Sequence, residues 1–160
     1  MQNSFEKKVF GDTAYTHKIL RLDQEYARSL CLNYWGTEYI ERVQWVMGTP
    51  YVNYQFKCDL CENGNHKKHN RPASFFPTTS GYLYTCAVCR PGLTLYQFMR
   101  GKNPFIADQY VVERWVNKLS GQGFNCPHPP KKLRAEYYKR IAEEERQKNK
   151  DKYERGDDRI

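Results

Sequence analysis

The residues with the clearest chemistry are four cysteines in two Cys-x-x-Cys pairs. Cys58 and Cys61 form the first pair, Cys86 and Cys89 form the second, and 24 residues separate them. Each pair places two thiolates on one tight turn, so that both sulfurs can reach a metal ion at about 2.3 Å. Two such turns facing each other complete a tetrahedron, and the spacing is close to that of a zinc ribbon. We therefore predict one structural zinc ion held by these four cysteines.

Other uses of the cysteines are less favoured. Disulfides are typical of secreted domains, and the first ten residues lack the apolar segment of a signal peptide. A thioredoxin-like redox pair needs a βαβ pattern, which surrounds neither motif. His66 and His69 could each replace a cysteine ligand, but the four cysteines already complete the set. Cys31 and Cys126 have no second pair beside them, and we expect both to be ordinary, partly buried residues.

The net charge of +8 is concentrated in two blocks of the chain. Residues 56–102 carry seven Lys or Arg against two Asp or Glu, and residues 131–160 carry eleven against eight. A zinc ion with four thiolates carries a charge of −2, so that the net charge of the first block becomes about +3 when the metal is bound. Such localisation is typical of a polyanion partner, most often nucleic acid. For the second block, a solvated surface rich in lysine explains the charge equally well.

Aromatic residues alternate with the cations of the first block. In a strand over 82–86, Tyr82 and Tyr84 share one face and Leu83 takes the other. Rings of this kind stack on bases, at about 1–3 kcal/mol per base. Alternatively, both tyrosines simply cover a small zinc core. The residues predicted to bind nucleic acid are Lys57, Lys67, Lys68, Arg71, Phe75, Tyr82, Tyr84 and Arg90, with Arg100 and Lys102 adding charge.

Length and composition limit the class of protein. A chain of 160 residues and 19.1 kDa is one ordinary domain, or a small domain with extensions. A hydrophobic share of 39% and a mean hydropathy of −0.90 allow only a modest core, while 15% aromatic residues argue against disorder. No apolar run approaches the 18 or so residues of a membrane span. We expect a basic, soluble, cytoplasmic protein without membrane contact.

Periodicity predicts the elements that position the cysteines. Helical spacing predicts a helix from Asp12 to about Leu32 and a second, shorter helix from Gly36 to about Gly48. Beyond these, the pattern predicts strands at 51–57, 72–77 and 82–86, a turn at 78–81, helices at 93–101 and from Asn103 to Leu119, a proline-rich linker at 124–130, and a C-terminal helix whose first turns alone dock.

The predicted fold class is α+β: a small zinc-ribbon antiparallel sheet flanked by helices, with an extended C-terminal helix. Three regions are expected. They are an N-terminal helical extension over 1–50, a zinc-ribbon domain with a trailing helix over 51–123, and a linker with a basic helix over 124–160.

The order of motifs within residues 55–100 resembles the N-terminal zinc-binding domain of DnaG-type DNA primases. The resemblance is carried by Phe56-Lys-Cys-Asp-Leu-Cys61, Arg71-Pro-Ala-Ser-Phe75, Tyr82-Leu-Tyr-Thr-Cys-Ala-Val-Cys89 and the helix from Leu93 to Met99. The all-cysteine ligand set and a trailing helix with Trp115 make it most similar to primases of tailed bacteriophages. Cellular relatives usually place a histidine in the first ligand pair.

This resemblance implies a role in choosing start sites for RNA primers on single-stranded DNA template, beside a separate polymerase domain. That family's polymerase domain holds Mg²⁺ with a glutamate and spaced aspartates. Here Asp157 and Asp158 sit in a charged tail, and Glu143 to Glu145 lack the strand context. The resemblance therefore implies no catalysis by this chain alone, with a polymerase-domain subunit and a replicative helicase as partners. A phage-encoded chain would work in the host cytoplasm.

Two other function classes stay open. The first is a transcription or translation accessory factor, because zinc ribbons commonly serve polymerases and ribosomes. A preference for duplex promoter DNA or ribosomal RNA would favour this class. The other is a protein-interaction adaptor of the replisome, with the C-terminal helix gripping the partner. Loss of partner binding on removing residues 131–160, with single-strand binding intact, would favour that adaptor.

Overall fold

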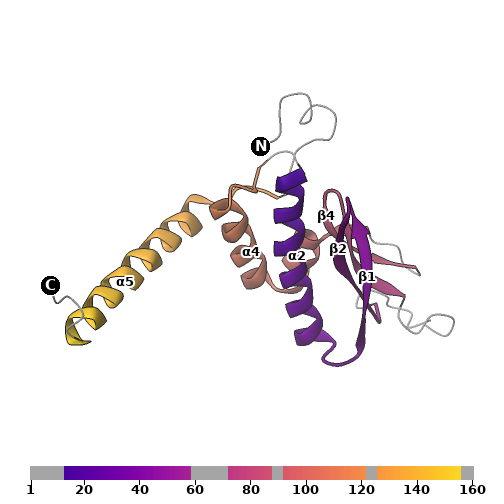
Figure 1. Ribbon diagram of the computed structural model, residues 1–160, viewed down its shortest axis with the longest axis horizontal. Helices are drawn as coiled ribbons and strands as arrows, with labels where there is room; N and C mark the ends of the chain where they lie inside the picture. The colour runs from indigo at the N-terminus through magenta and orange to yellow at the C-terminus, as the bar shows by residue number, and fades with distance from the viewer. Residues whose placement is uncertain (1–12, 59–71, 88–91, 122–125, 156–160) are drawn as a thin grey trace.

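The computed structural model describes residues 13–58, 72–87, 92–121 and 126–155. Within them, a five-stranded antiparallel sheet in the order β1-β2-β3-β4-β5 is accompanied by the helices α2, α3, α4 and α5. Figure 1 shows the sheet on one side of α2, α4 on the other, and α5 extending away from the body. The α+β class, the antiparallel sheet and the C-terminal helix are confirmed.

Helix α2 spans Thr13–Tyr34 and supplies one wall of the core. The apolar residues that it buries recur at helical spacing, which is why this segment was predictable. They are Ile19, Leu20, Tyr26, Ala27, Leu30 and Cys31. Just beyond the helix, the Trp35 ring stacks on Phe56 of the sheet at 3.9 Å between centroids.

The next segment is a β-hairpin, so the helix predicted from Gly36 to Gly48 is wrong. β1 spans Tyr39–Val46 and pairs with β2, Thr49–Phe56, along its whole length. Met47 and Gly48 join the strands with φ of 47° and 77°, the two positive values of a type I′ turn. The apolar spacing resembles that of a helix, but Val43 is 68% exposed and is not part of the core. β2 also runs across residue 50, where the sequence predicts a boundary.

The strands predicted at 72–77 and 82–86 are found close to those positions, whereas residues 93–94, predicted as the start of a helix, form a short strand. β3 spans Ala73–Thr78, β4 spans Gly81–Cys86 and the short β5 spans Leu93–Thr94. The turn between β3 and β4 is confirmed at 79–80, where Thr78 pairs with Gly81. Gly81 has a φ of 112°, and a Cβ there would meet the Asp23 carboxylate at 2.8 Å. Both its conformation and its neighbour therefore require glycine.

β2 and β3 pair over only three positions, and α2 fills the gap where they separate. The paired positions run from Tyr54 with Phe75 to Phe56 with Ala73. Beyond them, the Val52 N–H donates to the Gln24 side chain of α2 at 2.7 Å. The Val52 carbonyl accepts from the Tyr82 hydroxyl at 2.6 Å. Side chains thus satisfy backbone groups that would otherwise be buried without a partner.

Two helices follow the sheet, close to the predicted ranges. α3 spans Leu95–Lys102 and begins with a capping box between Thr94 and Gln97. α4 spans Pro104–Val116; the Asn103 side chain accepts from its first free N–H groups, and proline takes the first turn.

Helix α5 spans Lys131–Arg155 and touches the body only near its start. There Tyr137 meets Trp115 of α4 edge to face, at 6.1 Å between centroids. Its distal half is almost entirely exposed, which confirms that only the first turns dock. None of the helices in the described part of the chain is long and apolar enough to cross a bilayer.

A buried carboxylate joins α2, β4 and α4. Asp23 is 2% exposed and accepts from the Tyr82 N–H at 2.9 Å and from the Tyr110 hydroxyl at 2.5 Å. The Arg114 guanidinium, also buried, donates to that hydroxyl at 2.9 Å and to the Leu119 carbonyl at 2.8 Å. Burial raises the pKa of Asp23 to about 6, although its hydrogen bonds and Arg114 oppose the rise.

The raised pKa makes a prediction about stability and pH. Between 3.8, the ordinary value, and about 6, the folded state binds a proton that the unfolded state does not. The stabilisation of the folded state by proton binding to Asp23 is therefore complete at low pH and is lost as the pH rises through 6. Across this window the parent should lose up to about 3 kcal/mol of unfolding free energy relative to Asp23→Asn. Urea denaturation at a series of pH values measures this difference, and parallel curves would contradict it.

Candidate metal centre and its surroundings

Two of the four predicted zinc ligands lie at the same end of the sheet. Cys86 is the last residue of β4 and stands opposite Ala73, which in turn stands opposite Phe56 of β2. Cys58 follows Phe56 by two residues along the same strand direction. Cys58, just beyond the end of β2, and Cys86, at the end of β4, therefore lie at one edge of the molecule.

Both cysteines also point to the same face. Side chains alternate along a strand, so residues 54 and 56 share a face with 84 and 86 through the register. Cys58 lies two residues beyond β2, and its contact with the Tyr84 hydroxyl places its sulfur on the same face. This is the core face, and Cys58 and Cys86 are 9% and 1% exposed. Two sulfurs on one face and at one end satisfy the first requirement for a shared metal ion.

Neighbouring side chains orient the Cys58 end of β2. The Tyr84 hydroxyl lies 3.1 Å from the Cys58 sulfur, within hydrogen-bonding distance for sulfur. The Trp35 indole N–H donates to the Lys57 carbonyl at 2.9 Å. Sequence reasoning missed both contacts. The available signal for Tyr84 was its position two residues before Cys86, on the same face.

Several residues considered for the metal site or for nucleic-acid binding lie outside the described residues. These are Cys61, His66, Lys67, Lys68, His69, Arg71, Cys89 and Arg90. Among the residues that are described, no group of three or more His, Cys, Asp or Glu side chains comes together to hold a metal ion. The four-cysteine site therefore stays a prediction. Its two described members have the thiol chemistry and the shared location that structural zinc needs.

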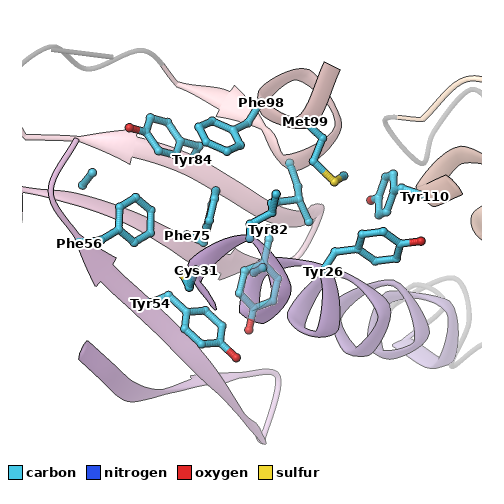
Figure 2. Packing of buried hydrophobic residues seen from close by; sticks show 14 of the residues in the cluster. Tyr26, Cys31, Tyr54, Phe56, Phe75, Tyr82, Tyr84, Phe98, Met99 and Tyr110 are labelled. Carbon is cyan, nitrogen blue, oxygen red and sulfur yellow. The ribbon is translucent and has the colours of Figure 1, made fainter. Parts of the chain in front are cut away.

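The aromatic residues predicted to stack on bases lie in the core. Phe75, Tyr82 and Tyr84 are each 1% exposed or less, which leaves no ring face for a base. Figure 2 shows Phe75 and Tyr84 gathered with Phe56 and Phe98, and the Tyr84 and Phe98 rings stack at 4.5 Å between centroids. Tyr82 and Tyr84 do share one face, as predicted, but that face is turned toward the helices. The stacking role is therefore wrong, and the alternative that these tyrosines cover the core accounts for them.

Three cations of the first charge block are described. Lys57 is exposed beside Cys58. Arg100 forms an ion pair with Asp108 at 2.9 Å, and the Lys102 ammonium lies over the Tyr34 ring at 4.8 Å from its centroid. Since the charge of Arg100 is partly neutralised, Lys57 is the described cation best placed to extend a basic surface from the cysteine end.

The two remaining cysteines are core residues. Cys31 is fully buried and Cys126 is 4% exposed. Burial raises the pKa of Cys31 to about 12 and that of Cys126 to about 11. Both are therefore neutral thiols near pH 7, unsuited to act as nucleophiles or as thiolate ligands.

Comparisons with known proteins add no further constraint on this site. No protein family, no curated protein and no solved structure matches the chain.

The burial of the rings predicts what their removal does. Phe75→Ala should lower the unfolding free energy by about 3–5 kcal/mol, because it opens a cavity between packed rings. Tyr153→Ala is the matched control, since Tyr153 is 73% exposed on α5 and its loss should cost no more than about 0.5 kcal/mol. Urea denaturation measures both. Similar stability losses for the two variants would mean that Phe75 is not a core residue.

Proposed function

We propose that this chain is a zinc-stabilised module that binds single-stranded DNA template, similar to the N-terminal zinc-binding domain of DnaG-type primases. Polymerase chemistry is assigned to a separate domain or subunit. The observation that carries the proposal is the shared position of Cys58 and Cys86, at one end and on one face of an antiparallel sheet. Each begins a Cys-x-x-Cys pair in the sequence.

The proposed metal site joins two strands that do not pair with each other. β3 lies between β2 and β4, so nothing in the sheet hydrogen bonds links their ends directly. Zinc bound by Cys58, Cys61, Cys86 and Cys89 would supply that link and hold the intervening chain segment at both ends. The Tyr84 hydroxyl would then donate to the Cys58 thiolate, as outer-shell groups commonly do at metal sites.

The proposed DNA contacts come from the segments attached to this site. Residues 59–71 connect β2 to β3 and contain Lys67, Lys68 and Arg71, and Arg90 follows the second cysteine pair. Since the nearby rings are in the core, we assign the affinity to phosphate contacts. Such contacts position a strand without reading its sequence.

The metal proposal is tested by zinc content. Purified protein should contain one zinc per chain, and Cys58→Ser or Cys86→Ser should remove most of it and lower the melting temperature, because a thiolate ligand is lost. Cys126→Ser is the matched control and should retain the metal. Tyr84→Phe keeps the ring and should weaken zinc binding about tenfold in competition with a chelator. Protein that is fully folded without zinc in elemental analysis would overturn the proposal.

The DNA proposal is tested by the salt dependence of binding. The triple variant Lys67→Ala, Lys68→Ala, Arg71→Ala should bind every single-stranded sequence more weakly. The slope of log K against log salt should become shallower by about 2, because each lost phosphate contact on single strands accounts for about 0.7. Fluorescence anisotropy with short DNA oligomers measures both effects.

A second triple variant controls for total charge. Lys148→Ala, Lys150→Ala, Lys152→Ala removes the same charge from the exposed part of α5 and should leave affinity and slope near those of the parent. If the Lys148, Lys150, Lys152 variant loses affinity and the Lys67, Lys68, Arg71 variant does not, the binding surface lies on the C-terminal helix. Stronger binding to duplex promoter DNA or ribosomal RNA than to single strands would favour the accessory-factor alternative.

A further inference from the structure

The outer edge of β1 is an exposed and largely apolar strand edge. β1 ends the strand order, and no other described strand pairs with its outer side. Val43 and Trp45 share one face of it and are 68% and 67% exposed. The charges of Glu41 and Arg42 cancel along the strand, so the edge lacks the positive charge that nucleic acid requires. These features favour a protein strand as its partner.

The backbone of β1 shows which residues can bond to such a partner. Val43 stands opposite Val52 of β2. The N–H and carbonyl of Val52 are bonded to Gln24 and Tyr82, on the side of β2 away from β1. Opposed residues in an antiparallel pair either exchange both bonds or neither. Val43 therefore directs its own N–H and carbonyl to the outer edge.

The same alternation applies two residues away. Trp45 stands opposite Pro50, which has no N–H to exchange, so Trp45 also points its backbone groups outward. The outward backbone groups and the exposed apolar side chains thus belong to the same two residues.

We propose that β1 of a second copy of this chain occupies this edge, antiparallel and related by a two-fold axis. Such an axis makes each contact occur twice. With Gln44 facing Gln44 of the second copy at the axis, Val43 of each chain stands opposite Trp45 of the other. These are hydrogen-bonded positions in both chains, and aromatic residues pair favourably with β-branched ones across strands.

Other registers that keep the exposed faces aligned are less favourable. Sliding the strands toward the start of β1 first sets Val43 against Val43 and gives each Trp45 ring the charged Glu41 as its partner, and then sets Arg42 against Arg42 of the second copy. Like charges directly opposite each other destabilise a strand pair. The arrangement with Val43 against Trp45 is therefore the one we assign.

The direction of the Val43 N–H provides the test. Val43→Pro removes a donor that points to the second copy and leaves the bonds between β1 and β2 intact; proline is tolerated on edge strands for this reason. Val43→Thr retains the N–H and the β-branched shape and is the matched control. Sedimentation velocity of the full chain should show a dimer that grows with concentration for the parent and for Val43→Thr. For Val43→Pro the dimer should be about 30-fold weaker, since two equivalent bonds are lost.

Hydrogen exchange of the parent gives a readout that needs no variant. The amides of Val43 and Trp45 should become more protected as protein concentration rises, whereas those of Arg42 and Gln44 should be protected at every concentration because they bond to β2. A parent that stays monomeric, or a dimer in which Val43 and Trp45 exchange freely, would overturn the proposal. So would Val43→Pro that is folded by circular dichroism and dimerises like the parent.

Discussion

The arrangement of α2, the sheet and α4 depends on one buried carboxylate. Asp23 of α2 accepts the backbone N–H of Tyr82 from β4 and the hydroxyl of Tyr110 from α4, so a single side chain fixes three elements that are distant in sequence. Arg114 completes the group by donating to the same hydroxyl. A buried charge is tolerable only with such partners, and removing one of them leaves the others unsatisfied. The position of α2 is therefore specified by polar geometry as well as by apolar packing.

The placement of α2 accounts for the different strand pairing at the two ends of the sheet. Near Asp23 the strands β2 and β3 separate, and Gln24 together with Tyr82 satisfies the backbone of Val52 in place of a neighbouring strand. At the opposite end the three central strands stay paired through Phe56, Ala73 and Cys86. Residues of α2 bond to β2 at the open end, and Cys58 and Cys86, the two predicted metal ligands that the structure describes, lie at the closed end.

Local sequence patterns predicted most of the helices and strands but not which face of each strand is buried. The start of a helix at Asn103, the turn before Gly81 and the alternation of Tyr82 with Tyr84 are short-range signals, and each is confirmed. The segment of β1 was predicted wrongly because its apolar residues are spaced as in a helix, while its strand pairing depends on β2 and on the turn at Met47. The partners of Asp23 lie 59 and 87 residues away, beyond what any local pattern specifies. The four-cysteine metal site as a whole stays a prediction, because Cys61 and Cys89 lie outside the described residues.

The aromatic core limits what this fold can offer a nucleic acid. Phe56, Phe75, Tyr84 and Phe98 pack on one another beside the cysteine end, so the rings nearest the proposed metal stabilise the sheet and are closed to bases. The proposed template binding would then depend on the lysines and arginines between the cysteine pairs rather than on these rings. The exposed Val43 and Trp45 lie toward the other end of β1, next to its turn. Pairing of two copies through β1 would therefore leave both cysteine ends accessible, so that one dimer could present two basic surfaces to a single DNA strand.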